Sequence, residues 1–371
     1  MPRRQSRRPV RYAVVGLGHI AQNAVLPAFK HARNSELAAI VSGDPAKRKA
    51  LARQYGITRT SDYEGYDALL RSGEIDAVYI ALPNDLHRDF AVRAAKAGVH
   101  ILCEKPLAVT ESDCRAMIEA ARRHRVLLMT AYRLHFDPAN LDAIERIRAG
   151  ELGDPRVFNS TFTMQVADGN IRVRKERGGG PLYDIGVYCI NAARYLFGDE
   201  PTEVVAVADR KKEKRFREVP ETVSATMRFP GARLASFVTS FGAADMGRFE
   251  VVGTKGSLEL DPAFEYAGGL REHVKGRRGT KSRAFSKHDQ FAAELIYFSR
   301  CIQKGKEPVP SGREGLADVR IIRAMMRSIR DGRPVKVSNE RSRRRPSGSL
   351  RIVRPPVRKP KVYRAPSPHP D

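Results

Sequence analysis

The chain has 371 residues, of which 42% are hydrophobic, so it is long enough for two ordinary domains. Its formal net charge is +25, and +14 of that charge lies in residues 1–11 and 341–371. The sequence contains no run of about 18 apolar residues, which excludes a membrane-spanning helix. The basic N-terminus lacks the apolar segment of a secretion signal. We therefore expect a cytoplasmic protein.

Residues 10–131 alternate short apolar runs with helical stretches. Strands are predicted in RYAVVG, ELAAIVSG, IDAVYIAL, HILCEKP and VLLMTAY, and helices over about 19–32, 45–55, 85–97 and 111–124. Continuous apolar strands between helices are typical of a parallel sheet that is covered on both faces. This region is predicted to be a doubly wound domain of an α/β protein.

Residues 132–337 have a different pattern. Longer strands with alternating apolar and polar residues are predicted in VFNSTFTMQV, TEVVAVAD, VSATMRFP, LASFVTSF, RFEVVGT and GSLELDP. This alternation predicts a second, α+β domain with a mostly antiparallel sheet. Residues 1–9 are predicted to form a flexible basic arm. Residues 338–371, rich in proline and basic residues, are predicted to form a disordered tail.

A glycine motif follows the first predicted strand. Gly16, Gly18 and Ala21 form G-x-G-x-x-A, which allows a tight turn and lets backbone N–H groups approach a pyrophosphate at a helix N-terminus. The motif predicts a dinucleotide site. Its expected contacts are Gly16, Leu17, Gly18, His19 and Ile20.

The end of the second strand bears on the choice between NAD and NADP. A carboxylate there binds the ribose 2′-OH of NAD, whereas cations without it leave room for a 2′-phosphate. The strand ends at Ser42 and Gly43, and Lys47 and Arg48 open the next helix, so we favour NADP bound by these four residues. In the alternative, the two cations are solvated, Asp44 takes the ribose, and the cofactor is NAD.

Three further segments, LPNDLH, CEKP and AYRLHF, follow predicted strands and are expected at the ligand-binding edge of the sheet. A lysine directly after an apolar strand and fixed by proline is a candidate catalytic residue, and this residue is Lys105. His87 is given a supporting role. The expected cofactor contacts in these segments are Leu82, Pro83, Asn84, His87, Glu104, Lys105 and Arg133.

The segment GGGPLYDIGVYCIN carries polar residues at helical spacing. Asp184, Tyr188 and Asn191 recur at i, i+4 and i+7, which places them on one face of a helix. Such a stripe is either a solvent-facing side or the wall of a pocket.

Taken together, the motifs GLGHIA, PNDLH, EKP, AYRLHF, GGGPLYDIGVYCINAARYLFG and EGLADVRIIRAMMRSIRDGRPV resemble the glucose-fructose oxidoreductase family, also called Gfo/Idh/MocA, over about residues 10–337. The resemblance implies an N-terminal Rossmann domain, an open C-terminal sheet that forms homo-oligomers, and hydride transfer at a sugar or polyol carbon. It implies Lys105 and Asp184 as catalytic residues and Tyr188 as the acid–base residue. Tyr188 with Asn191 is similar to the subgroup around glucose-fructose oxidoreductase itself.

The resulting hypothesis is an NADP-dependent oxidoreductase that acts on an aldose such as glucose or xylose. A nearby ammonium favours the phenolate of a tyrosine, and Lys105 is assigned this role toward Tyr188. The expected substrate contacts are Lys105, Tyr132, Arg133, Asp184 and Tyr188, and no metal site is predicted.

Two alternatives stay open. One is an NAD-dependent inositol or polyol dehydrogenase, or an enzyme for a phosphosugar bound by Arg133 and by Arg172 or Arg174. The other is a non-catalytic nucleotide sensor, or a protein that binds nucleic acid nonspecifically through its basic ends and the basic stretch 271–287.

Overall fold

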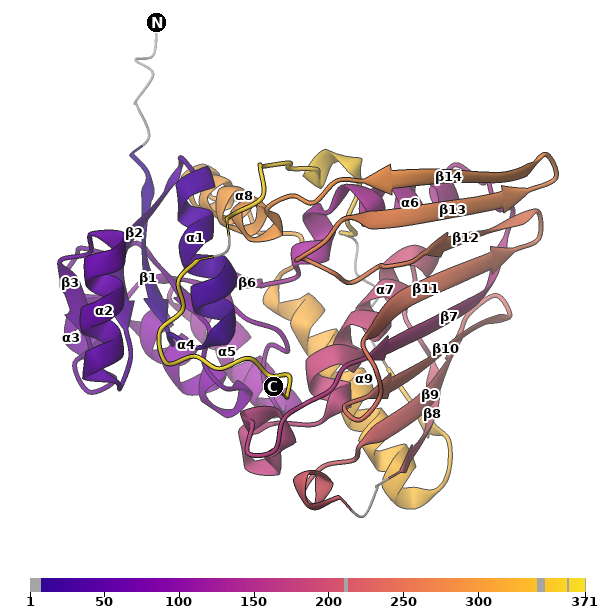
Figure 1. Cartoon of the computed structure of the whole chain (residues 1–371), viewed down its shortest axis with the longest axis horizontal. Coiled ribbons are helices and arrows are strands. Elements are labelled where there is room, and N and C mark those ends of the chain that lie inside the picture. The colour runs from indigo at the N-terminus through magenta and orange to yellow at the C-terminus, as the bar shows by residue number, and fades with distance from the viewer. Residues whose placement is uncertain (1–7, 210–212, 339–343, 359, 371) are drawn as a thin grey trace, which may run out of the picture.

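The computed structural model describes residues 8–209, 213–338, 344–358 and 360–370 (Figure 1). The first of its two sheets is parallel and six-stranded, in the order β3-β2-β1-β4-β5-β6. This order confirms the predicted doubly wound domain. Its strands are β1 (Val10–Val15), β2 (Ser35–Val41), β3 (Arg59–Ser61), β4 (Ala77–Ile80), β5 (His100–Cys103) and β6 (Leu128–Thr130).

Helices cover both faces of this sheet because successive strand residues point to opposite sides and both sets are apolar. Tyr12 and Val14 face one layer, and Ala13 and Val15 face the other. The first layer contains α1 (Leu26–Ala28), α2 (Pro45–Tyr55) and α8 (Gln290–Lys304), and the second contains α3 (Tyr66–Arg71), α4 (His87–Lys96) and α5 (Glu111–Arg123).

The helix expected over residues 19–32 is continuous over residues 19–31, but from residue 21 on it divides into three stretches that differ in their hydrogen-bonding pattern. They are a π-helical turn η1 (Ala21–Val25), the α-helical turn α1 and a 3₁₀ turn η2 (Phe29–His31). Pro27 lies in the middle and has no backbone N–H to continue the helical hydrogen bonds. The expected helix is therefore present after the glycine motif, with an irregular hydrogen-bonding pattern.

The second sheet has nine strands in the order β14-β13-β12-β11-β7-β10-β9-β8-β15. All its pairs are antiparallel except β7 with β10. This arrangement confirms the expected mostly antiparallel sheet. The strands are β7 (Pro155–Thr163), β8 (Glu203–Asp209), β9 (Thr222–Phe229), β10 (Arg233–Ser240), β11 (Met246–Gly253), β12 (Gly256–Leu260), β13 (Leu270–Gly276), β14 (Gly279–Phe285) and β15 (Val335–Lys336).

Helices lie against one face of the second sheet. The apolar sides of α6 (Pro138–Arg148), α7 (Val187–Phe197) and α9 (Gly312–Asp331) share a core with Phe158, Phe237 and Phe249 of the sheet. A second π-helical turn, η7 (Leu182–Gly186), leads directly into α7. In the described part of the chain, no helix has both the length and the apolar character needed to cross a membrane.

The C-terminal tail differs from the expectation of disorder over the residues that the structure describes there, 344–358 and 360–370. The tail runs back across the first domain as an extended segment, drawn in yellow in Figure 1. Its backbone hydrogen-bonds to the body, with Tyr363 N donating to Gln22 Oε1 at 2.7 Å and Ala167 N donating to Pro368 O at 2.8 Å. Composition predicted correctly that the tail has no core of its own, but docking on another surface satisfies its polar groups.

Candidate active site

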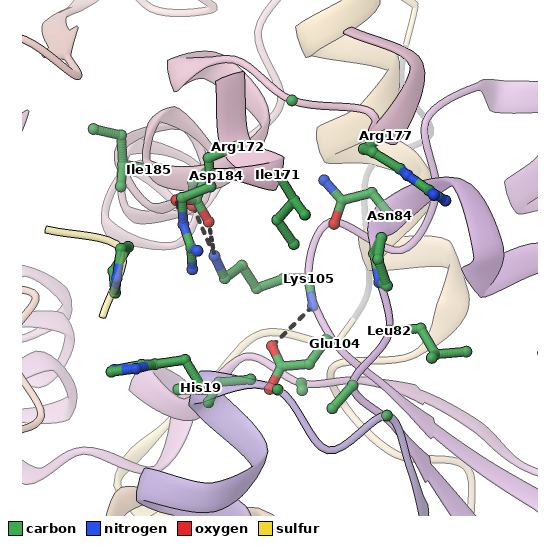
Figure 2. A pocket seen from close by; sticks show the side chains of 18 of the residues that line it. His19, Leu82, Asn84, Glu104, Lys105, Ile171, Arg172, Arg177, Asp184 and Ile185 are labelled. Carbon is green, nitrogen blue, oxygen red and sulfur yellow. Dashed lines mark hydrogen bonds and ion pairs between the residues drawn. The ribbon is translucent and has the colours of Figure 1, made fainter. Parts of the chain in front are cut away.

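A cavity of 470 Å³ lies where the carboxyl ends of the parallel strands face the second domain. Its wall includes the loops that follow β1, β2, β4, β5 and β6, together with residues of η7, α7 and the second sheet. Figure 2 shows Lys105 reaching across it toward Asp184 and Arg172. Doubly wound sheets bind their ligands at this edge. Most of the predicted site residues therefore line a cavity at the expected edge of the sheet.

The glycine loop forms one wall of the cavity through residues 16–20. Gly16 has a φ of 91°, and a Cβ there would lie 2.5 Å from the carbonyl oxygen of Ala81, so only glycine fits. A Cβ at Gly18 would meet no atom within 4 Å, so the loop backbone there is open to a ligand. A turn that opens onto a helix start and lets a ligand approach its backbone fits a dinucleotide pyrophosphate.

The residues after β2 lie at the far end of this wall. Ser42 and Lys47 line the cavity, whereas the Arg48 guanidinium donates a hydrogen bond back to the carbonyl of Ser42. Gly43 lies against Tyr63: a Cβ at Gly43 would be 3.2 Å from the nearest atom of the Tyr63 ring. Asp44 caps α2 by accepting a hydrogen bond from Lys47 N at 3.0 Å. Of the four predicted 2′-phosphate contacts, two therefore face the cavity directly.

The loop after β4 brings Leu82, Pro83 and Asn84 to the cavity, as expected. His87 does not reach it. Its ring is fully buried and lies within hydrogen-bond distance of the carbonyl oxygens of Leu82, at 2.9 Å, and Pro106, at 3.0 Å. His87 therefore holds the β4 and β5 loops together, as a supporting residue would, but its position does not support the expected contact with the cofactor.

Lys105 and Asp184 form an ion pair at the centre of the cavity. Lys105 Nζ donates to Asp184 Oδ1 at 3.1 Å and to the Asp184 carbonyl at 2.7 Å, and Arg172 Nε donates to Asp184 Oδ2 at 2.7 Å. Burial opposes ionisation of Asp184, but Arg172 and Lys105 outweigh it and lower the pKa of the carboxyl. Burial also opposes the charged form of Lys105 and lowers its pKa, but Asp184 and Tyr188 outweigh burial, so the net shift of the Lys105 pKa is upward. Both groups are charged at neutral pH.

Tyr188 lies between two cations. Arg133 Nε donates to the Tyr188 hydroxyl oxygen at 3.3 Å, and Lys105 Nζ lies 4.8 Å from the centre of its ring. Arg133 is buried and fixed by hydrogen bonds to the side chain of Gln290 and to the carbonyl of Phe264. The arrangement places the hydroxyl beside a guanidinium and the ring beside an ammonium, in the wall of the cavity.

Glu104 belongs to a buried group beneath Lys105. The Tyr79 hydroxyl donates to Glu104 Oε1 at 2.8 Å and lies 3.4 Å from Glu294 Oε2. Burial raises the pKa of the Glu104 carboxyl, and burial together with the Glu104 charge raises that of Glu294 well above its ordinary value. Because like charges in a buried site repel each other, one of the two carboxyls is favoured to be protonated.

Two predicted polar residues point away from the cavity. Tyr132 is buried and donates its hydroxyl to Asp318 Oδ2 at 2.5 Å, so its position does not support the expected contact with substrate. Asn191, one turn beyond Tyr188, accepts from His135 Nε2 at 2.8 Å and donates to Asp318. The polar stripe on this helix therefore divides, with Asp184 and Tyr188 in the cavity wall and Asn191 in a sealed interior.

The second domain adds an aromatic wall that the sequence analysis missed. The rings of Phe162 and Phe264 stack at 4.9 Å, and the Tyr188 ring lies 5.6 Å from the first and 6.0 Å from the second. Alternation identified the β7 strand but not which of its ends meets the first domain. Phe264 lies in an irregular loop, and no local pattern could have placed it beside Tyr188.

The fold and the site define a nicotinamide-type dinucleotide oxidoreductase, with a glycine loop at one end of the cavity and a lysine–aspartate–tyrosine cluster at the other. Residues 10–132 match the model of the "Oxidoreductase family, NAD-binding Rossmann fold", GFO_IDH_MocA, and residues 141–259 match the "GFO/IDH/MocA C-terminal domain". The chain belongs to the Gfo/Idh/MocA family, and the protein is an NAD(P)-dependent oxidoreductase.

Relatives with stated activities cover nearly the whole chain. D-xylose 1-dehydrogenase (NADP(+)) 2 of Haloferax volcanii is 32% identical, with 88% of this chain and 99% of the relative covered. The crystal structure of aldose-aldose oxidoreductase from Caulobacter crescentus superposes with a TM-score of 0.86 at 39% identity, covering 89% of this chain and 100% of that one. KijD10, a 3-ketoreductase from Actinomadura kijaniata in complex with NADP and TDP-benzene, has a TM-score of 0.79 at 28% identity, with 86% and 98% covered.

Proposed function

We propose that the protein transfers a hydride between NADP(H) and the carbon of a neutral aldose such as glucose or xylose. The observation that carries the proposal is the Lys105–Asp184–Tyr188 cluster in the same cavity as the glycine loop. The relatives support the substrate class, since one is a D-xylose 1-dehydrogenase with NADP(+) and another an aldose-aldose oxidoreductase.

The residues of the cavity fit the two ends of the cofactor. Gly16 to Ile20 would hold the pyrophosphate, and Ser42 with Lys47 would hold the 2′-phosphate. Leu82, Pro83, Asn84 and Glu104 line the part of the cavity between the glycine loop and Lys105, where they would contact the nicotinamide half. The cofactor supplies the hydride chemistry when bound. Orientation and proton movement then belong to the side chains around Lys105.

Tyr188 is the proposed acid–base residue. In the direction of sugar oxidation, its oxygen takes the proton of the sugar hydroxyl as the C–H hydrogen leaves with its electron pair, and in the reverse direction it returns that proton. Arg133 donates to this oxygen at 3.3 Å, and Lys105 lies over the ring, so two cations stabilise the negative charge that the oxygen carries. Asp184, held by Arg172 and Lys105, positions the ammonium and accepts hydrogen bonds from the sugar hydroxyls.

A neutral sugar fits better than a phosphosugar or an acidic sugar. Arg172 lines the cavity, but its guanidinium is bound to Asp184 at 2.7 Å. Arg174 lies outside the cavity wall and donates to Glu218 at 2.8 Å. Arg133 is committed to Gln290, Phe264 and Tyr188. The arginines considered for a phosphate therefore have partners already.

The experiment is steady-state turnover of glucose and xylose with NADP and with NAD, in the wild type and in Tyr188→Phe. We expect activity with NADP and a loss of about 10²- to 10⁴-fold in kcat for Tyr188→Phe, the usual contribution of a positioned acid–base group. Tyr195→Phe is the matched control, because it makes the same change on the same helix at a hydroxyl bound to Asn140. Equal activity of Tyr188→Phe and Tyr195→Phe would contradict the assignment.

We further propose that the protein forms homo-oligomers through the open face of the second sheet. Apolar side chains remain exposed there. Val157 and Leu234 pair across β7 and β10, and Val205 and Val207 lie on β8, which β9 separates from β10. Covering such a patch is a common reason for association. The cytoplasmic location expected from the sequence stays a prediction.

The alternative role as a nucleic-acid binder is less well supported by the tail. Two of its arginines lie beside carboxylates of the same chain: Arg345 beside Glu200 and Arg351 beside Asp142. A phosphate backbone would have to compete with these partners.

A further inference from the structure

The C-terminal tail crosses the mouth of the cofactor cavity. Gln54 Nε2 donates to the Lys361 carbonyl at 3.2 Å, and Gln22 binds the backbone of Tyr363 on both sides, at 2.7 and 2.9 Å. The tail then passes the imidazole of His19, which lies against the backbone of Ala365 and Pro366. Hydrogen bonds at three points hold this part of the tail in one path, counting the bond of Pro368 to Ala167.

Two residues of the tail are part of the cavity itself. Pro368 and His369 line it together with the glycine loop and Asp184. His369 Nδ1 lies 3.6 Å from Asp245 Oδ2, a residue of the second domain that also lines the cavity. The tail therefore extends from the first domain to the second over the glycine loop, and a cavity remains beneath it.

Arg364 lies where this path passes the end of β2. Its guanidinium is 3.6 Å from Asp44 Oδ2 and packs on the ring of Tyr363, and its backbone has a φ of 48°. A non-glycine residue in this left-handed region is uncommon, so the surrounding contacts fix the local path of the chain. The Arg364 side chain is 61% exposed, so its guanidinium can rotate toward a ligand.

The carboxylate of Asp44 is the feature that argues against NADP, because a carboxylate after β2 binds the ribose hydroxyls of NAD and repels a 2′-phosphate. In this structure Asp44 accepts from Lys47 N, and Lys47 and Arg364 both lower the pKa of its carboxyl. Its negative charge is thus offset from two sides. One of the two cations comes from a segment more than 300 residues away in the chain.

We propose that Arg364 is a cofactor-specificity residue: it neutralises Asp44 and pairs with the 2′-phosphate of NADP, while residues 365–369 cover the bound dinucleotide. This inference rests on the proposed NADP-dependent function and assigns the tail to the same site. Guanidinium and phosphate form strong charge-assisted hydrogen bonds. Because the tail is already held across the groove, the backbone of Arg364 loses little conformational freedom when the cofactor binds.

The test is the dissociation constant of NADPH and of NADH, followed by the fluorescence of the reduced nicotinamide, for the wild type, Arg364→Gln and Arg358→Gln. Arg358 is an exposed arginine of the same tail. Among the described residues, it makes no contact with Asp44, Lys47 or the glycine loop. We expect Arg364→Gln to weaken NADPH binding about 10-fold, to leave NADH within about 2-fold, and Arg358→Gln to change neither. Arg364→Lys, which keeps the charge, should recover part of the preference.

The outcomes separate this inference from the function on which it rests. If the wild type binds neither dinucleotide, the proposed function fails. If the wild type binds NADPH but Arg364→Gln binds it equally well, only the role of Arg364 is wrong. An equal loss for NADPH and NADH would also overturn the role, because a specificity residue must discriminate between the two.

Discussion

Two buried charge clusters share the helical segment formed by η7 and α7, and they differ in what lies beside them. Near its start, Asp184 pairs with Lys105 and Arg172, and Tyr188 follows in the wall of a 470 Å³ cavity. Two turns further on, Arg194 is 1% exposed and lies outside the wall of that cavity. Buried, paired charges therefore do not by themselves mark an active site. An adjoining space for a ligand does.

The second cluster, called the sealed cluster below, consists of Arg194 and the carboxyls around it. Arg194 donates to Asp318 at 2.6 Å, to Glu314 at 3.0 Å and to Glu200 at 2.8 and 2.9 Å. Burial and Glu314 raise the pKa of the Asp318 carboxyl to about 6, although Arg194 opposes the shift. This cluster joins α7 to α9, so its role is to fix the packing of the two helices rather than to act on a ligand.

The largest expected effect separates the two clusters by activity. Lys105→Met removes the ammonium beside Tyr188, and we expect kcat/KM to fall by about 10³-fold. The variant should keep its thermal unfolding midpoint near that of the wild type, because Arg172 still pairs with Asp184. Lys96→Met, on the exposed side of α4, is the control and should keep full activity.

The next effect separates the clusters by stability. Arg194→Met leaves three carboxyls without their common partner, and we expect it to lower the free energy of unfolding by about 3–5 kcal/mol. Protein that remains folded should turn over sugar at close to the wild-type rate. Urea unfolding measures the loss, with Arg122→Met, at an exposed pair with Glu119, as a control that should shift the midpoint little. A stable but inactive Arg194→Met would reverse the assignment of the two clusters.

A smaller effect concerns the pH dependence of stability through His135, which Asn191 links to Asp318 of the sealed cluster. Burial lowers the pKa of His135 to about 4, below the ordinary value of 6.5, although the Asn191 oxygen opposes the shift. The unfolded chain therefore takes up this proton first as the pH falls. The stability that neutral His135 contributes is present above pH 6.5 and is lost progressively between 6.5 and about 4, by about 3 kcal/mol.

Replacement of this residue checks the sign. His135→Gln cannot titrate, so its unfolding midpoint should fall less steeply between these pH values than that of the wild type. His124→Gln, at an exposed position at the end of α5, should keep the wild-type slope. Identical slopes for the wild type and His135→Gln would show that the imidazole is not held neutral in the folded protein.

The sequence predicted the features of the fold and of the candidate site that depend on local residue patterns. Most strands followed from apolar runs and alternation, but β3, β13, β14 and β15 were not predicted. The glycine loop, Lys105, Asp184 and Tyr188 followed from motifs at strand ends and at helical spacing. The residue spacing could not tell Asp184 and Tyr188 from Asn191, because whether a helix face meets a cavity depends on the packing of α9 and the second sheet.

Other parts depended on contacts between distant segments. Gln290 and Phe264 fix Arg133 from positions more than 100 residues away, and neither carries a local signal. The docked tail escaped prediction for a related reason. Composition shows that a segment cannot fold by itself, but not that another surface, here that of Gln22 and Ala167, will pair with its backbone.

The most direct test of the central claim is to follow a labelled hydrogen. Xylose carrying deuterium at its anomeric carbon is mixed with the wild-type protein and NADP, and the reduced cofactor is analysed by mass spectrometry. If the cavity transfers a hydride from the sugar carbon, the deuterium appears in NADPH, and Lys105→Met slows its appearance. If neither xylose nor glucose labelled in this way reduces NADP, or if NADPH forms without the label, the protein does not carry out the proposed reaction.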